Sequence, residues 1–131
     1  MIAVLIDDEP KARNVLRILL EENCPEIETI YEAEDLLSGV SIIKAQQPQL
    51  VFLDIEMPEH SGLEIVNFID KDAFQFEIIF TTAYSEYAIK AFELAAIDYI
   101  LKPIRPKQVR QAVSRASKLI GKSHINKKLD V

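Results

Sequence analysis

The sequence predicts an α/β fold built on a parallel sheet, and three observations support this prediction. Short apolar runs alternate along the chain with longer amphipathic segments. The run IAVLI is apolar throughout, which is typical of a strand covered on both faces. Five such strand–helix units follow one another in series. Because parallel neighbours need a crossover connection, this order favours a doubly wound parallel sheet with helices on both faces.

The first unit pairs a strand over Ile2 to Ile6 with a helix over Pro10 to Asn23. Pro10 suits the first turn of a helix, where an N–H group has no intrahelical partner, and Pro25 follows the end. Four further pairs are predicted in the same way. They are Ile27–Tyr31 with Leu36–Ala45, Leu50–Leu53 with Gly62–Ile69, Glu77–Thr81 with Glu86–Ala95, and Asp98–Leu101 with Pro106–Ile120.

Residues 1–120 are therefore expected to form one domain, and residues 121–131 a polar tail or a truncated linker. The net charge of −6 and the pI near 4.9 argue against a surface that grips nucleic acid phosphates. Cys24 is the one cysteine, so no internal disulfide can form, which favours a reducing compartment. No apolar run reaches membrane-spanning length, and a cytoplasmic protein that does not associate with a membrane is expected.

Reactive side chains follow four of the five predicted strands. They are Asp7 and Asp8 after the first strand, Asp54 at the end of the third, Thr82 at the end of the fourth and Lys102 after the fifth. Each alone is unremarkable, because acids cap helices and strands often end on a polar turn residue. In an open α/β sheet, however, ligands bind outside the carboxyl ends of the strands. The coincidence predicts a single site at that edge.

The charges of this site suggest its chemistry. Three clustered carboxylates repel one another by roughly a few kcal/mol per pair, so either one is protonated or a divalent cation neutralises them. Oxygen ligands with room for water and phosphate are what Mg²⁺ prefers. A carboxylate beside Mg²⁺ is a competent nucleophile toward a phosphoryl group and forms an acyl phosphate. Lys102 and Thr82 would bind the phosphoryl oxygens by charge and by a hydroxyl.

The chain resembles response-regulator receiver domains over about residues 1–120. The matching motifs are LIDDEP, VFLDIEMP followed by SGLE, IIFTTAY and DYILKPI, in the family's order. The resemblance implies a flavodoxin-like (βα)5 fold with strand order 2-1-3-4-5. It also implies that a histidine kinase phosphorylates Asp54, and that Asp7, Asp8, Asp54 and the backbone carbonyl of Glu56 hold Mg²⁺.

The same resemblance assigns the remaining roles. Thr82 is implied as the switch hydroxyl, Tyr99 as the switch aromatic and Lys102 as the phosphoryl-binding lysine. Such a domain is not an enzyme in the usual sense, since it catalyses only its own phosphorylation and dephosphorylation. The segments IIFTTAYSEYAIKAFE and AIDYILKPI look like receivers of the LytTR (LytR/AlgR) class. That class carries a C-terminal DNA-binding domain, so DNA is an expected partner only through an output domain that is missing here.

Two further expectations concern kinetics and signalling. Glu56 and Tyr84, each two residues beyond a site residue, are hypothesised to tune attack of water on the acyl phosphate. Phosphorylation is expected to draw Thr82 toward the phosphate and to turn Tyr99 inward. The face expected to change carries Lys90, Glu93, Arg110 and Arg115 beside Ala91 and Val109. This face suits either a phosphorylation-dependent homodimer or an ordinary solvated helix surface.

Two other functions remain open from the sequence. One is a degenerate receiver that acts as a phosphorylation-independent protein-interaction scaffold, although the full set of reactive residues counts against it. The other is a small Mg²⁺-dependent phosphatase with an aspartyl nucleophile, because Asp54-Ile55-Glu56 loosely imitates the paired acids of such enzymes. Phosphatases of that kind need additional loops or a cap to hold a substrate, and this chain has little length to spare.

Overall fold

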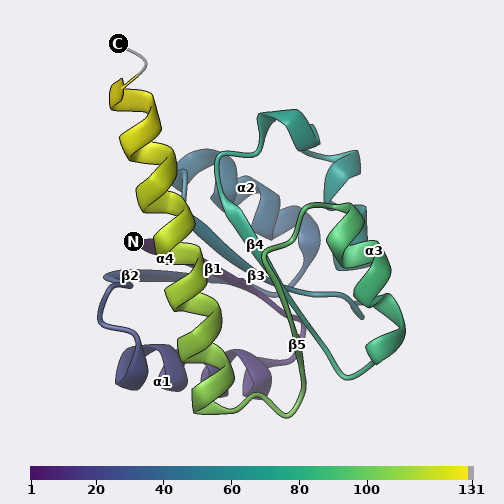
Figure 1. The fold of residues 1–131 in the computed structure, drawn as a ribbon. Coiled ribbons are helices and arrows are strands. Elements are labelled where there is room, and N and C mark those ends of the chain that lie inside the picture. The colour runs from purple at the N-terminus through teal and green to yellow at the C-terminus, as the bar shows by residue number, and fades with distance from the viewer. Residues whose placement is uncertain (130–131) are drawn as a thin grey trace.

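A five-stranded parallel sheet lies at the centre of the computed structural model, which describes residues 1–129 (Figure 1). The strand order is β2-β1-β3-β4-β5, which confirms the predicted flavodoxin-like fold. The strands are β1 Ile2–Ile6, β2 Thr29–Ala33, β3 Leu50–Asp54, β4 Glu77–Thr82 and β5 Asp98–Leu101. No helix among the described residues is long and apolar enough to cross a membrane.

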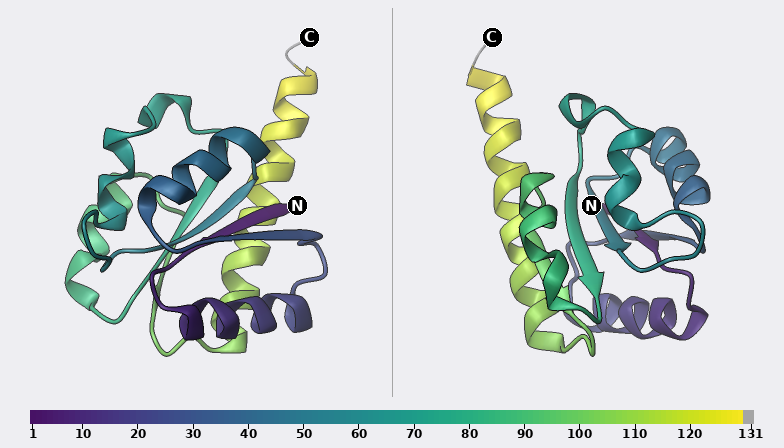
Figure 2. Two further views of the ribbon diagram at one scale, coloured as in Figure 1. Left: turned by 180° about the vertical axis from the view of Figure 1, so that it is seen from behind. Right: turned by 90° about the vertical axis from the view of Figure 1, so that its right-hand side faces the viewer.

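Helices cover both faces of this sheet, and Figure 2 shows α2 and α4 on opposite sides of it. The α-helices are α1 Pro10–Asn23, α2 Leu36–Gln46, α3 Ala88–Glu93 and α4 Pro106–Leu129. Three short 3₁₀ helices join them: η1 Gly62–Asn67, η2 Lys71–Ala73 and η3 Ser85–Tyr87. Each crossover connection carries a helix back across the sheet, so that the apolar face of the helix packs against the strands.

The sheet separates two hydrophobic cores because successive strand residues point to opposite faces. In β1, Val4 and Ile6 belong to the core formed with α2, η1 and α3. Ala3 and Leu5 belong to the core formed with α1 and α4. All four side chains are buried, which explains why this strand is apolar throughout.

The second strand begins two residues later than the sequence predicts. Ile2 pairs with Thr29, so Ile27 lies in the turn before β2, where it packs against the α1 side of the core. The N–H of Glu28 donates to the carbonyl of Met1 at 2.9 Å and fixes this register. The apolar character of Ile27 therefore reflects its burial beneath a turn.

Two of the predicted helices are shorter in the structure than expected. The segment predicted over residues 62–69 is the 3₁₀ helix η1, which ends at Asn67. Ser61 caps its start, and the N–H of Ser61 donates to Glu64 Oε2 at 2.6 Å. The segment predicted over residues 86–95 divides into η3 and α3. Lys71 donates to the Glu93 carbonyl at 2.6 Å, and Ala95 takes a left-handed conformation with φ 62°, so α3 ends at Glu93.

The last helix is longer than predicted. The helix predicted to end at Ile120 continues through the polar segment as far as Leu129. The division into a domain of residues 1–120 and a tail or linker of residues 121–131 stays a prediction. Residues 107–129 contain no proline, and extending an existing helix adds a hydrogen bond per residue without a new nucleation step. The final two residues of the expected tail, 130–131, lie outside the described residues.

Candidate functional site at the carboxyl edge of the sheet

Three carboxylates meet at the carboxyl ends of β1 and β3. Asp7 and Asp8 follow β1, and Asp54 is the last residue of β3. One carboxylate oxygen from each lies within 4.8 Å of the other two. Asp54 is only 3% exposed, so its carboxylate is withdrawn from water while it faces two other acids. The structure thus brings together the three acids that the sequence places at this edge.

A single ammonium group enters this cluster from the loop after β5. Lys102 Nζ donates to Asp7 Oδ2 at 2.9 Å and lies 3.6 Å from Asp54 Oδ2. The N–H of Lys102 donates to the Thr82 carbonyl at 2.7 Å, and the Lys102-Pro103 peptide is cis. Burial lowers the pKa of Lys102, but its hydrogen bond to Asp7 and the charges of Asp54 and Asp7 outweigh this, and the pKa is raised.

The electrostatics of Asp54 reflect the excess of negative charge. Its pKa is raised to about 7, first because the carboxyl is buried and second because the charge of Asp7 lies close by. Lys102 offsets this only in part. Three carboxylates against one ammonium leave room for a further cation, and an all-oxygen donor set of this kind fits Mg²⁺.

A hydroxyl completes the edge. Thr82 is the last residue of β4 and is buried, one position beyond Thr81, which pairs in register with Asp54. The Thr82 Oγ1 accepts a hydrogen bond from the N–H of Tyr84 at 3.2 Å. Four elements of one sheet edge therefore supply an acid pair, a buried acid, a hydroxyl and an ammonium group.

The comparisons with known proteins identify the family of this chain. A model of the family "response regulator receiver domain" matches residues 3–114. The chain belongs to this family. It is the receiver domain of a two-component response regulator, as the sequence predicts.

The receiver is similar to several longer regulators. It is 42% identical over 124 residues to an uncharacterized response regulatory protein of Vibrio vulnificus, covering 95% of this chain and 50% of that protein. It is 45% identical over 116 residues to the transcriptional regulatory protein BtsR of Escherichia coli, covering 88% and 48%. The chain thus spans about half the length of these curated relatives. The response regulatory domain of protein MrkE from Klebsiella pneumoniae shares 27% identity at a TM-score of 0.82, covering 93% of this chain and 99% of that one.

The main chain of Tyr84 connects the two predicted switch residues of the receiver. Its N–H donates to Thr82 Oγ1, and its carbonyl accepts a hydrogen bond from the hydroxyl of Tyr99 on β5. Tyr99 packs partly against the core, and its phenol group reaches this carbonyl at the surface. The Tyr84 side chain itself is exposed. Thr82 and Tyr99 are therefore joined through the main chain of one residue.

Tyr87 makes a contact near the site that was not predicted from the sequence. Its hydroxyl donates to Glu56 Oε1 and so ties the loop after β3 to η3. This hydrogen bond, followed by burial and the charge of Glu56, raises the pKa of Tyr87 to about 12. No spacing in the sequence points to this pair, because the two residues belong to different loops and meet only after the sheet has formed. The role of the Glu56 carbonyl toward Mg²⁺ stays a prediction.

The close approach of Gly62 to Asp54 is a second feature that was not predicted from the sequence. A Cβ atom at this position would lie 2.2 Å from the Asp54 carbonyl oxygen and 2.9 Å from Leu53 Cγ. The N–H of Gly62 donates to the Ile55 carbonyl at 3.0 Å. The start of η1 therefore lies directly against the backbone of Asp54, and only glycine fits there.

The apolar part of the predicted signalling face needs correction. Ala91 and Val109 are fully buried and cannot contact a partner. The exposed apolar side chains of α3 are instead Ile89, 76% exposed, and Phe92, 57% exposed. Arg115 of α4 donates to Asp98 of β5 at 2.7 Å, so one of the expected charges is paired within the chain.

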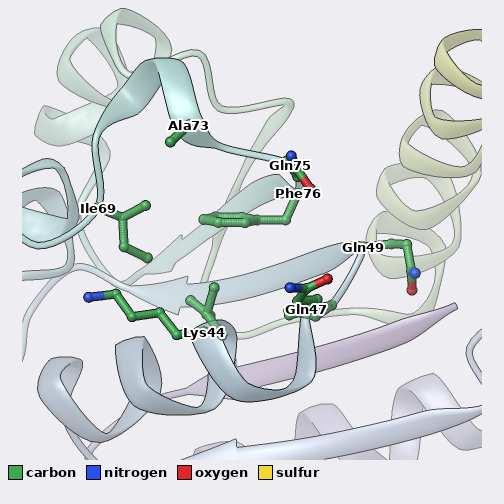
Figure 3. Close-up of a pocket in the computed structure, with 9 residues that line it drawn as sticks. Lys44, Gln47, Gln49, Ile69, Ala73, Gln75 and Phe76 are labelled. Carbon is green, nitrogen blue, oxygen red and sulfur yellow. The ribbon is translucent and has the colours of Figure 1, made fainter. Parts of the chain in front are cut away.

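A separate cavity lies away from these residues. It has a volume of about 490 Å³ and lies at the opposite, amino-terminal edge of β3 and β4 (Figure 3). Figure 3 shows Lys44 of α2 and Gln47 just after this helix on one side of it, and Ile69, Ala73 and Phe76 on the other. It contains none of the predicted site residues, so cavity size does not mark the reactive edge of this receiver.

Proposed function

We propose that Asp54 accepts a phosphoryl group from a histidine kinase in a Mg²⁺-dependent reaction. In this proposal, phosphorylation controls a DNA-binding output domain of the LytTR class in the full-length regulator. One observation carries the proposal: a buried carboxylate at the end of β3 lies among two further acids, with one ammonium 3.6 Å away. Buried charge of this kind is costly to maintain, which favours a reactive role over a structural one.

Each residue of the site has a part in this chemistry. Asp7, Asp8 and Asp54, with the Glu56 carbonyl, would hold Mg²⁺, which when bound neutralises negative charge on carboxylates and phosphoryl oxygens. An Asp54 carboxylate oxygen attacks phosphorus while the bond from phosphorus to the kinase histidine nitrogen breaks. Lys102 gives up part of its contact with Asp7 to bind a phosphoryl oxygen, and the Thr82 hydroxyl donates to another.

The main chain of Tyr84 would transmit the effect of phosphorylation from Thr82 to Tyr99 at the surface. When the Thr82 hydroxyl turns toward the phosphoryl group, its hydrogen bond with the Tyr84 N–H is lost. The adjoining Tyr84 carbonyl then no longer holds the Tyr99 hydroxyl, and Tyr99 can turn inward. Moving such a two-state element from ~1% to ~99% active takes about 5.5 kcal/mol. Two charge-assisted hydrogen bonds at about 3 kcal/mol each, or four at about 1.5 kcal/mol each, supply this difference.

The kinase is proposed to dock beside α1. The exposed residues Val15 and Ile18 lie on this helix, and a cavity of about 260 Å³ runs from Val15 to Lys102 and Ile104. Lys102 Nζ lies 3.6 Å from Asp54 Oδ2, so an apolar groove that begins at this lysine is suitably placed to seat the phosphodonor. The LytTR class rests on the motif resemblance and on relatives named as transcriptional regulatory proteins.

Intact-protein mass after incubation with acetyl phosphate tests the proposal, with and without Mg²⁺. We expect a single phosphoryl adduct that requires Mg²⁺ and is absent from Asp54→Asn. An adduct without Mg²⁺, or one that survives in the variant, would contradict the assignment. A folded protein with no adduct would leave the degenerate, scaffold-type receiver. Turnover of a generic phosphate ester would instead support the phosphatase.

A further inference from the structure

The guanidinium group of Arg13 connects α1 to the segment that carries the acid pair. Its Nη1 donates to the backbone carbonyl of Asp7 at 2.6 Å, and its Nε donates to Glu32 Oε1 at 3.2 Å. The side chain is only 16% exposed. One residue of α1 thus holds a residue of β2 and the peptide that follows β1 at the same time.

A second arginine fixes the position of Glu32. Arg17 Nε donates to Glu32 Oε2 at 2.7 Å, and its Nη2 donates to the Ile30 carbonyl at 3.1 Å. Among the described residues, the other hydrogen bond of Arg17 is to Glu21, so this side chain touches no part of the acid pair. Arg13 and Arg17 therefore share one carboxylate, but only Arg13 reaches Asp7.

Every polar group of Asp7 is engaged in this arrangement. Its N–H donates to the Ala33 carbonyl at 3.1 Å, and its Oδ1 accepts from the N–H of Glu9 at 2.9 Å. Its Oδ2 accepts from Lys102. Arg13 supplies the contact to the remaining group, the backbone carbonyl. Without this contact, the peptide between Asp7 and Asp8 would lose the hydrogen bond that sets its orientation. The orientation of this peptide determines the direction in which the two carboxylates leave the chain.

We propose that Arg13 is a positioning residue for the acid pair. Its hydrogen bond to the Asp7 carbonyl fixes the Asp7–Asp8 peptide in the orientation that binds Mg²⁺. This inference rests on the proposed function, because it requires that the acid cluster binds Mg²⁺. Groups that orient a ligand residue without touching the metal contribute substantially to metal affinity, since they remove the cost of ordering the ligand at the moment of binding.

The test is the affinity of the unphosphorylated protein for Mg²⁺, measured by isothermal titration calorimetry. We expect Arg13→Gln to weaken Mg²⁺ binding by roughly tenfold, the lower end of the range for residues that orient metal ligands. Arg17→Gln is the matched control, because it also removes an arginine bonded to Glu32 and to a backbone carbonyl. We expect it to leave Mg²⁺ affinity nearly unchanged. Arg13→Lys, which keeps a cationic donor to the Asp7 carbonyl, should restore part of the affinity.

The outcomes separate this inference from the function on which it rests. No binding of Mg²⁺ by the wild-type protein contradicts the proposed function itself. If the wild type binds and Arg13→Gln binds equally well, the positioning role is wrong. An equal loss in Arg13→Gln and Arg17→Gln would show a structural role alone and would also overturn it. Absence of any rescue by Arg13→Lys counts against the hydrogen bond to the carbonyl.

Discussion

At the scale of single residues, the clustered carboxylates at the carboxyl edge of the sheet lower the stability of the folded protein. Asp54 is buried beside two other acids, and burial is the larger of the causes that raise its pKa. Lys102 compensates only part of this negative charge. The free energy of unfolding of the metal-free protein therefore includes an unfavourable contribution that catalytic carboxylates commonly make.

Asp54→Asn should accordingly stabilise the metal-free protein. The amide keeps the shape of the side chain but removes the buried charge, and we expect an increase of about 1–3 kcal/mol in the free energy of unfolding. Urea unfolding in the presence of a chelator measures this difference. Added Mg²⁺ should stabilise the wild type more than the variant. A variant less stable than the wild type under chelation would contradict this electrostatic account.

Gly62 and Gly121 form a matched pair. Gly62→Ala places a methyl group against the Asp54 carbonyl, and we expect a loss of stability of about 1–3 kcal/mol with slower phosphorylation. Gly121→Ala is the control, because a Cβ atom there meets nothing within 4 Å and the residue lies inside α4. It should stabilise the protein by up to about 1 kcal/mol. Thermal unfolding of both variants checks the prediction, and equal effects would disprove it.

The buried thiol of Cys24 should make the free energy of unfolding fall at alkaline pH. Burial raises the pKa of its thiol from 9.0 to about 11. Because the folded-state pKa is the higher one, this residue's contribution to stability is complete below pH 9 and is lost as the pH rises from 9 to 11. We expect a difference on the order of 1–2 kcal/mol. Urea unfolding of the wild type and of Cys24→Ala between pH 8 and pH 10.5 isolates it; parallel pH profiles would refute the prediction.

At the scale of secondary-structure elements, local signals and tertiary contacts determine different parts of the fold. The bounds of α1 were predictable, since helical periodicity and a proline at its start are properties of the sequence alone. The bounds of α3 were not, because a lysine of η2 and a left-handed alanine end it. The convergence of the acids followed from the parallel topology. The contacts of Tyr87 with Glu56 and of Arg13 with Asp7 depend on distances that no sequence pattern encodes.

The exposed side of α1 yields a prediction about the kinase. Val15 is 50% exposed and lines the groove that begins at Lys102. Val15→Glu should slow phosphotransfer from the kinase at least tenfold, because a charge would have to be desolvated at the contact. Phosphorylation by acetyl phosphate needs no docking surface and should be unchanged. Leu119→Glu on α4, a similarly exposed apolar residue outside this groove, serves as the control. Equal loss with both donors would place Val15 outside the docking surface.

At the scale of the whole molecule, apolar and basic side chains gather on different surfaces of this acidic domain. The exposed residues of α3 include two large apolar side chains, and α4 carries a shallow basic groove lined by Arg110, Arg115 and Lys118. Large apolar side chains exposed near charges are typical of surfaces that associate reversibly. A parallel sheet could be predicted because one strand–helix pattern recurs five times, and its strand order followed from the family resemblance. The composition of this surface required the structure.

A phosphorylation-dependent homodimer through α3 should therefore require Phe92. We expect sedimentation velocity to show that the wild type associates at tens of micromolar when a phosphoryl mimic is present. Phe92→Asp should remain monomeric and yet accept the phosphoryl group at the normal rate, because the side chain lies on the exposed side of α3. A wild type that stays monomeric with the mimic bound would exclude strong dimerisation through this surface.

The hydrogen bonds of Tyr84 have a consequence for how this domain can diversify. Both bonds that join Thr82 to Tyr99 use main-chain atoms of Tyr84. A change of the exposed side chain at this position leaves the N–H and the carbonyl in place. Only proline, which lacks the N–H, would interrupt the first bond. Substitution of the Tyr84 side chain by any residue other than proline is therefore expected to preserve the link between Thr82 and Tyr99, so this position is open to variation within an unchanged hydrogen-bond framework.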